Sequence, residues 1–238
     1  MLGLFSFLIR KDGMTHAEFS DHWRNVHARI ALENSGSMRH VRRYVQNHLV
    51  PGMNDSAPFD GVAEAWYEDA AALRALFEDR DYRAVVHADE QRFLEVKRCV
   101  TVITEPVPMY ESAAARGEAN AGVVRLLALM ARKPGITLGE FSRYWRERHG
   151  PLVLGLGSLQ GRALRYVQNH RVAESPFPSK REPAWDGVAD VWYESAQACT
   201  GAMDPQQYER VIAPDEEKFV DRSRLTFLIV SPYFVIDR

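Results

Sequence analysis

The sequence has 238 residues, of which 46% are hydrophobic and 26% charged, with a formal net charge of −2 at pH 7. These values are ordinary for a globular protein, and the scattered Lys and Arg residues make no basic patch of the kind that binds nucleic acid. No apolar run is long enough to span a membrane, and two isolated cysteines, Cys99 and Cys199, fit a reducing compartment. We therefore expect a cytoplasmic protein without a nucleic-acid or membrane partner.

The first predicted elements are a strand and a helix. The apolar run Leu2–Ile9 has the composition of a strand, and a Lys-Asp-Gly turn follows it. Thr15 and Glu18 then form the T-x-x-E pattern of a helix N-terminus, which recurs at Thr137 and Glu140. The helix that they start carries an apolar face made by Phe19, Trp23, Val26 and Ile30.

The next predicted elements complete a six-element unit. Two strands, Val41–Val50 and Gly61–Tyr67, precede a helical stretch from Asp69 to Val96 that is interrupted near residues 79–81. A β-branched run, Arg98–Thr104, closes the unit. The order β-α-β-β-α-β is the ferredoxin-like pattern.

Long stretches of the chain occur twice. The segment FSDHWRNVH at Phe19–His27 aligns with FSRYWRERH at Phe141–His149, and the hexapeptide RYVQNH occurs at Arg43–His48 and Arg165–His170. Both pairs are 122 positions apart, as 43 and 165 show. A repeat of this length is a small domain and not a solenoid unit.

The second part of the repeat keeps the same order at a larger offset. FDGVAEAWYE at Phe59–Glu68 aligns with WDGVADVWYE at Trp185–Glu194, now 126 positions apart, because the Pro-rich stretch SPFPSKREPA adds four residues. We therefore expect a first repeat at residues 1–108, a linker at residues 109–121 and a second repeat at residues 122–238. Four strands with helices on one side leave a bare sheet face, and two such halves can cover each other.

The segments FSRYWRERHGPL, RYVQNH and DGVADVWYE together resemble the EthD family of dimeric α/β-barrel proteins. The resemblance covers nearly the whole chain as two copies. The second copy keeps a W-R-x-x-H-x-P-L pattern, made by Trp145, Arg146, His149, Pro151 and Leu152. The first copy departs from this pattern after His27, where no proline follows.

The resemblance implies an α+β fold in which two ferredoxin-like βαββαβ repeats pair their antiparallel sheets into an intramolecular dimeric α/β barrel. It also implies a small aromatic ligand and the absence of a cofactor, and it allows a homodimer of the two-repeat chain. Activities known or proposed in the family include cofactor-free decarboxylation and dehydration of phenolic compounds, and other members are accessory proteins without settled chemistry.

Four repeated histidines are the catalytic candidates. His27 and His149 lie four residues after Trp23 and Trp145, so each is drawn to the buried face of its helix, either as a structural histidine near the helix end or as a catalytic one. His48 and His170 end the RYVQNH strands, whose alternation puts Tyr, Gln and His on one face. A polar strand of this kind indicates either a ligand cavity or a buried hydrogen-bond network, and we favour the cavity.

Two carboxylates stand inside apolar strands. Glu64 and Asp190 could hold the charge of His48 and His170 in an acid–base site, or they could be neutralised by arginines such as Arg24 and Arg146 or Arg43 and Arg165. The sequence leaves both readings open. His87 has Ala213 as its counterpart, so if His87 takes part in catalysis only the first half is complete. We expect two unequal sites, with His27 and His48 in one cavity and His149 and His170 in the other.

The sequence holds no convincing metal-ligand set, no glycine-rich phosphate loop, no dinucleotide fingerprint and no nucleophile elbow. We expect a cofactor-independent, metal-free lyase, most simply a decarboxylase, that acts on a phenolic small molecule of a catabolic or biosynthetic pathway by histidine-assisted acid–base catalysis. The alternatives are a non-catalytic binding or accessory protein, and a cyclase or dehydratase of polyketide-like aromatics. The predicted substrate-binding residues are Tyr44, Tyr166, Asn47, Asn169, Glu64, Asp190, Trp23, Trp145, Trp66, Trp192, Arg24 and Arg146.

Overall fold

The structure, a computed structural model, describes residues 1–54, 56–115, 122–157, 159, 161–177 and 183–238. Its strands form one closed barrel in the order β1-β3-β2-β8-β5-β7-β6-β4, and every pair of neighbours is antiparallel. The strands are β1 (Leu2–Leu8), β2 (Val41–Leu49), β3 (Gly61–Tyr67), β4 (Val100–Glu111), β5 (Val124–Met130), β6 (Ala163–Arg171), β7 (Gly187–Tyr193) and β8 (Thr226–Asp237).

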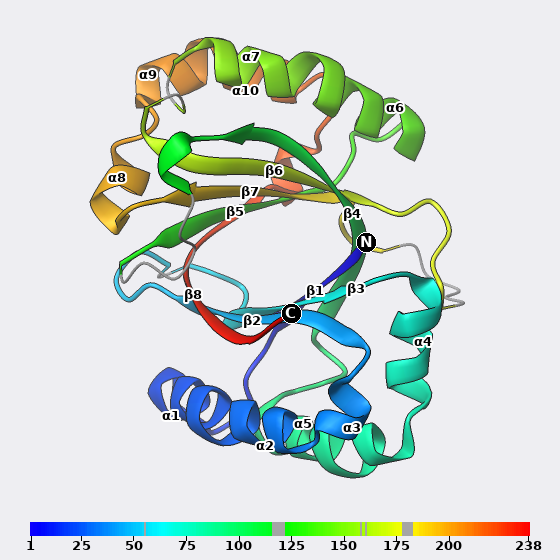
Figure 1. The fold of residues 1–238 in the computed structure, drawn as a ribbon. Helices are drawn as coiled ribbons and strands as arrows, with labels where there is room; N and C mark the ends of the chain where they lie inside the picture. The colour runs from blue at the N-terminus through cyan, green and yellow to red at the C-terminus, as the bar shows by residue number, and fades with distance from the viewer. Residues whose placement is uncertain (55, 116–121, 158, 160, 178–182) are drawn as a thin grey trace.

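The helices lie outside the barrel, those of the first half on one side and those of the second half on the opposite side (Figure 1). Those of the first half are α1 (His16–Asp21), η1 (His22–His27), α2 (Ala28–Glu33), α3 (Ser35–Met38), α4 (Ala70–Glu78), η2 (Tyr82–Val86) and α5 (His87–Phe93). Those of the second half are η3 (Ala113–Ala115), α6 (Leu138–Tyr144), η4 (Trp145–His149), α7 (Gly150–Gly155), α8 (Ala196–Thr200), α9 (Pro205–Gln207), η5 (Tyr208–Ile212), α10 (Ala213–Glu216) and η6 (Arg222–Arg224). Within the described residues, no helix combines the length and the apolar character that a membrane span needs.

The expected order of strands and helices is confirmed in both halves. Both T-x-x-E patterns are capping boxes. The side chains of Thr15 and Thr137 accept from the backbone N–H of Glu18 and Glu140, and the backbone N–H of each threonine donates to the side chain of the same glutamate. The predicted interruption near residues 79–81 separates α4 from η2.

The closing strand of each half is longer than expected. The first five residues of β4 pair with β1, and residues from Thr104 to Glu111 pair with β6 of the other half. Strand β8 likewise pairs first with β5 and then with β2. The extension was not predicted, because Pro106 and Pro108 argue against a strand. The structure tolerates both prolines because this part of β4 pairs with a strand on one side only. The expected linker at residues 109–121 therefore begins inside β4.

Each long helical stretch contains a π-helical turn in which the carbonyl of an aromatic residue accepts from the backbone N–H five residues later. The backbone N–H of Ala28 donates to the carbonyl of Trp23, five residues earlier, and the turns that start at Trp145, Tyr82 and Tyr208 repeat this pattern. π-helical turns are rare in proteins, and many of those that occur lie at functional sites. Two of these turns end in the candidate histidines His27 and His149.

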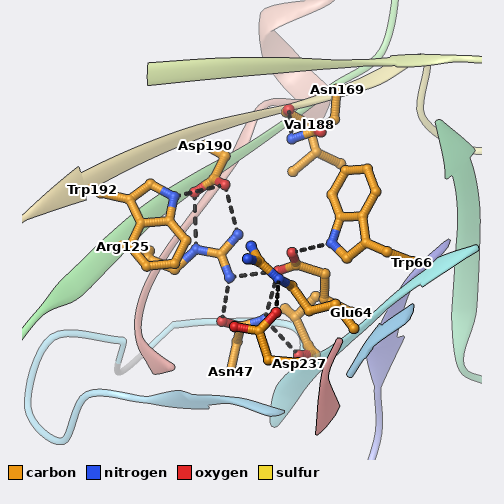
Figure 2. A network of polar contacts seen from close by, with 11 residues as sticks. Asn47, Glu64, Trp66, Arg125, Asn169, Val188, Asp190, Trp192 and Asp237 are labelled. Carbon is orange, nitrogen blue, oxygen red and sulfur yellow. Dashed lines mark hydrogen bonds and ion pairs between the residues drawn. The ribbon is translucent and has the colours of Figure 1, made fainter. Parts of the chain in front are cut away.

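The inside of the barrel is apolar over much of its length, where Phe5, Phe7 and Val62 of the first half meet Leu127 and Leu129 of the second. One end instead holds a polar network around Arg125, a fully buried arginine of β5 (Figure 2). The Nε and Nη2 atoms of Arg125 donate to Asp190 at 3.0 and 2.6 Å, and Nη1 donates to Glu64 at 2.5 Å and to Asn47 at 2.8 Å.

This network joins the two halves, since Arg125 and Asp190 come from the second repeat and Glu64 and Asn47 from the first. Burial alone would lower the pKa of the Arg125 guanidinium, but Asp190 and Glu64 outweigh it and raise the pKa above its ordinary value. The guanidinium therefore stays charged inside the barrel. The ring of Trp192 lies 4.3 Å below it and adds a cation–π contact.

Removing the guanidinium should destabilise the protein strongly. We expect Arg125→Met to lower the free energy of unfolding by about 3–5 kcal/mol, because two buried carboxylates lose their partner. Adding Glu64→Gln and Asp190→Asn to that variant should recover most of the loss, since no buried charge is then left unpaired. Urea unfolding of the single and triple variants measures both effects, and a triple variant as unstable as the single one would contradict this account.

Candidate active site

The RYVQNH strands fasten the helices to the barrel. The indole N–H of Trp23 donates to the Tyr44 hydroxyl at 3.0 Å, and Gln46 Nε2 donates to the backbone carbonyl of Trp23 at 2.7 Å. His48 Nε2 lies 3.1 Å from Gln46 Oε1. The second half repeats these contacts with Trp145, Tyr166, Gln168 and His170. The face that carries Tyr, Gln and His therefore serves a buried hydrogen-bond network.

This network fixes the protonation of His48. Because the amide nitrogen of Gln46 faces a carbonyl, its Oε1 faces His48 and accepts the Nε2 proton, which leaves Nδ1 to accept from the Ser20 hydroxyl at 2.8 Å. Burial, with smaller contributions from Arg24 and His16, lowers the pKa of His48 to about 3. Both ring nitrogens are occupied and the ring is neutral, so the geometry is that of a structural histidine.

His170 differs from His48 in the surroundings of one ring nitrogen, Nδ1. Its Nε2 lies 3.0 Å from Gln168 Oε1, but its Nδ1 is buried without a partner among the described residues. Burial, aided by Arg146, lowers the pKa of His170 to about 4.

The inward face of the same strands belongs to a different region. Asn47 and Asn169 lie inside the barrel, where each donates Nδ2 to a strand carbonyl, of Val62 and Val188 respectively. Glu64 and Asp190 lie there too, and the indoles of Trp66 and Trp192 donate to them at 2.6 and 2.9 Å (Figure 2). The expectation that these carboxylates hold the charge of His48 and His170 is wrong, because strand alternation puts the two groups on opposite faces of the sheet.

Arg24 and Arg146 lie on the exposed side of their helices. The guanidinium of Arg24 stacks over the Tyr233 ring at 4.7 Å, and Arg146 pairs with Glu147 at 2.9 Å. The arginine that neutralises the buried carboxylates Glu64 and Asp190 is therefore Arg125, and not Arg24 or Arg146. The predicted set of binding residues is therefore divided between the inside of the barrel, the helix–sheet network and the surface.

A buried histidine–aspartate pair joins the two helices of the first half. His27 Nδ1 lies 2.9 Å from Asp89 Oδ2, and His22 Nε2 lies 3.2 Å from both oxygens of the same carboxylate. Burial alone would raise the pKa of Asp89, but the hydrogen bonds from His27 and His22 lower it below its ordinary value. The Asp89 carboxylate orients the His27 ring through Nδ1, and Nε2 has no hydrogen-bond partner among the described residues.

The second half contains the matching pair. His149 Nδ1 lies 2.9 Å from Asp215, and the hydroxyl of Tyr144 donates to the same carboxylate at 2.7 Å in place of His22. Burial lowers the pKa of His149, so this ring is neutral.

A cavity of about 220 Å³ lies in the first half between the sheet and the helices. Apolar and aromatic side chains make most of its wall, and the polar groups in the wall include His27, His87, Glu90 and Tyr44. His27 Nε2 has no hydrogen-bond partner among the described residues, and His48 is not part of the wall. The expected pairing of His27 with His48 in one cavity is therefore wrong, because the ring of Trp23 packs against His48 at 4.6 Å.

A second polar cluster lines the same cavity. His87 Nδ1 lies 2.7 Å from Glu90 Oε2, and the Tyr82 hydroxyl donates to Glu90 Oε1 at 3.2 Å. The hydrogen bond with Glu90 raises the pKa of His87 above its ordinary value despite partial burial. The cavity wall thus combines His27, whose Nε2 has no partner among the described residues, with His87, whose raised pKa favours the protonated form.

The two halves are unequal at this point. Ala213 replaces His87, and Glu216, the counterpart of Glu90, accepts from Tyr208 at 2.7 Å and lies 3.5 Å from Arg222 Nε. Met109, Leu154 and Leu156 pack against the core beneath the second-half helices. The second half therefore lacks the histidine that accompanies the pair in the first.

The second half also contributes to the wall region of the first. Phe177, from the Pro-rich stretch that lengthens the second repeat, packs edge-on against Phe77 with ring centres 5.2 Å apart. Phe77 is part of the cavity wall. The stretch that holds the four extra residues of the second repeat thus places Phe177 against the cavity wall of the first half.

Sequence reasoning missed the partners of the candidate histidines. Asp89 and Asp215 recur at the 126-residue offset, and a carboxylate repeated beside a repeated histidine is the signal that could have revealed the pair. Arg125 was missed as well, although a lone charge in the apolar strand VRLLALM is unusual.

A closed antiparallel barrel with helices outside and a cavity beneath one helical layer defines an α+β barrel protein. The EthD domain family matches residues 11–97 and 133–223, one stretch in each half, and the chain therefore belongs to that family.

Other proteins resemble this chain over part of its sequence or in its fold. Dehydratase ustZ of Ustilaginoidea virens is 26% identical over 106 residues, which are 41% of this chain and 75% of that protein. A solved structure from Fusobacterium nucleatum, proposed to be a monooxygenase, covers 98% of this chain and 92% of its own with a TM-score of 0.59 and 9% identity. A proposed monooxygenase from Lactobacillus acidophilus also covers 98% of this chain and 94% of its own, with a TM-score of 0.56 and 9% identity. The last two likenesses concern the fold alone.

The neutral histidines should make stability depend on pH. Because the folded pKa of His170 is about 4 and the unfolded pKa about 6.5, the unfolded chain binds more protons between these values, and stability falls as the pH falls through this window. His170→Gln keeps a donor toward Gln168 and removes the titration. We expect the loss of unfolding free energy between pH 6.5 and 4.5 to shrink by about 2 kcal/mol, measured by urea unfolding. An unchanged loss would mean that His170 is protonated in the folded protein.

Proposed function

We propose that the chain is a cofactor-independent lyase that removes water from a small ring compound in the first-half cavity and makes the ring aromatic. The observation that carries the proposal is the His27–Asp89 pair. His27 lines a cavity of about 220 Å³, and its Nε2 atom has no hydrogen-bond partner among the described residues. A cavity of about 150 Å³ can already hold benzene, so a substituted ring is of suitable size. The largely apolar wall favours an uncharged ring.

The reaction needs one base and one acid. Neutral His27, oriented by Asp89, would take the proton from the ring carbon next to the carbon that bears the hydroxyl group. The electron pair of that C–H bond becomes the new ring double bond, and the C–O bond breaks. Protonated His87 would give its proton to the departing hydroxyl, which leaves as water. His27 and His87 both line the cavity, which supports these two roles.

Dehydration fits this wall better than decarboxylation does. A decarboxylase must hold a carboxylate, and neither Lys nor Arg is among the described residues that line the cavity. The similarity to a protein named as a dehydratase points the same way. Decarboxylation stays as the second candidate because protonated His87 could pair with a carboxylate and then protonate the ring carbon.

We also infer that each half is a ferredoxin-like unit, with the division at residues 1–108 and 122–238 and a connection between them. The strand orders β4-β1-β3-β2 and β8-β5-β7-β6 support this inference, since each half has the same order. The proposed activity belongs to the first unit, and the second supplies barrel strands and the contact of Phe177.

The duplication provides a matched control for catalysis. We expect His27→Gln to lower kcat/KM about 10²-fold or more, because the base is lost, while His149→Gln leaves it within about twofold. The assay is the ultraviolet absorbance that appears when monocyclic and fused cyclohexadienols lose water. Thermal unfolding of both variants checks that the folded state persists.

Equal losses in the two histidine variants would contradict a first-half site. Wild-type protein that binds these ring compounds without converting them would instead favour a non-catalytic accessory role.

The role of His87 predicts a pH dependence. The rate should fall as the pH rises through the pKa of His87, which Glu90 holds above its ordinary value, because only the protonated form is an acid. His87→Ala, which copies Ala213 of the second half, should lower the rate and abolish this alkaline decline. A pH–rate profile that keeps the same decline in the variant would assign the acid to another group.

A further inference from the structure

Two side-chain hydroxyl groups lie in the wall of the first-half cavity, and the proposed dehydration uses neither of them. Ser6 of β1 and Thr101 of β4 are both part of the wall, and their hydroxyl oxygens are 3.2 Å apart. The two strands pair in a register that makes these residues direct cross-strand neighbours. Ser6 is half-buried and Thr101 is exposed, so the cavity wall reaches solvent at this pair.

The hydrogen bond between the two hydroxyl groups leaves one proton without an acceptor. Each hydroxyl group has one proton to donate and lone pairs that can accept. Whichever of the two oxygens accepts the bond, its own proton has no other partner among the described residues. The pair can therefore both donate to and accept from an oxygen atom of a ligand.

The part of the sheet around this pair is apolar. Leu4 and Leu8 lie on either side of Ser6 along the same face of β1, and Ala63 is its cross-strand neighbour on β3. All three belong to the cavity wall. A ring that rests on this surface makes apolar contacts with the leucine and alanine side chains, and the hydroxyl pair offers a polar contact among them.

The second half lacks both hydroxyl groups at the aligned positions. Ala128 aligns with Ser6 and Phe227 with Thr101, at the repeat offsets of 122 and 126 positions. Strands β5 and β8 again make these two residues direct neighbours, so the sheet pairs in the same register without a hydroxyl pair. The histidine that corresponds to His87 is missing from this half as well. The hydroxyl pair thus accompanies the candidate acid and is not required to form the sheet.

We propose that Ser6 and Thr101 bind an oxygen substituent of the ring substrate and so select ring compounds that carry a second oxygen besides the departing hydroxyl group. This inference rests on the proposed function, because it places the second substituent of the same ring in the same cavity. Two polar contacts at separate places in the wall fix the ring more firmly than one, and thereby determine which ring carbon faces His27.

The test measures binding and does not depend on turnover. Isothermal titration of the full chain with resorcinol, a ring with two hydroxyl groups, is compared with titration with benzene, which has none. Ser6→Ala combined with Thr101→Val removes both hydroxyl groups with little change of shape. We expect this double variant to bind resorcinol about three- to tenfold more weakly, as the loss of neutral hydrogen bonds implies, and benzene within about twofold of the wild type. An unchanged affinity for resorcinol, or an equal loss for both ligands, would overturn the proposal.

Two further variants locate the effect. Thr101→Ser keeps the hydroxyl group, and Phe227→Thr adds one at the aligned position of the second half, so both should bind resorcinol as the wild type does. Thermal unfolding confirms that each variant is folded, and weaker binding by either folded variant would contradict a role of the first-half hydroxyl groups.

The same titrations separate this proposal from the proposed reaction. A wild-type protein that binds resorcinol through Ser6 and Thr101 but converts no cyclohexadienol would refute the dehydration and support the binding role of the pair. A wild-type protein that does not bind resorcinol, whether or not it converts cyclohexadienols, would overturn the selection of a second oxygen.

Discussion

The rest of the structure depends on the way in which β4 and β8 each divide their length between two partners. One part of each strand completes the sheet of its own half, and the other part adds to the sheet of the opposite half. This exchange closes the barrel and removes exposed sheet edges, which are otherwise prone to unwanted pairing. It also gives every strand one face toward an enclosed interior and one toward helices. The inner face then carries Arg125 with its carboxylates, and the outer face carries the histidine sites.

Strand alternation explains why the same six residues are written twice. In each copy of RYVQNH, the tyrosine, glutamine and histidine hold the π-helical turn at Trp23 or Trp145, and the asparagine enters the barrel. The glutamine donates to the backbone carbonyl of the tryptophan in this turn, so a buried amide fixes strand and helix to each other. With the helices held in this way, His27 reaches Asp89 from a different element, and the orientation of its ring is set.

Local signals predicted the order of the elements, both capping boxes and the tandem repeat, because each depends on residues close together in the chain or on direct comparison of its two copies. Comparison of the two copies shows that Asp89 and Asp215 recur, but it does not show that they contact the histidines, since Asp89 is 62 positions from His27 and on another helix. The reach of β4 past Pro106 depended on pairing with β6, which no local pattern reports. Arg125 was hidden for a related reason, because its function as a partner of two carboxylates appears only once the barrel is closed.

Joining the halves in one polypeptide removes a constraint that symmetry imposes on assemblies of identical subunits. In a two-fold symmetric barrel every substitution appears twice, so an arginine at this position of the strand would bring two guanidinium groups and two bulky neighbours into the same narrow interior. The fused chain has Arg125 in one copy and Gly3 in the other, with Trp66 taking the space that the second arginine would need. Mutation and selection can therefore change one half at a time. Equivalent residues of the two halves can then acquire different functions within a single molecule.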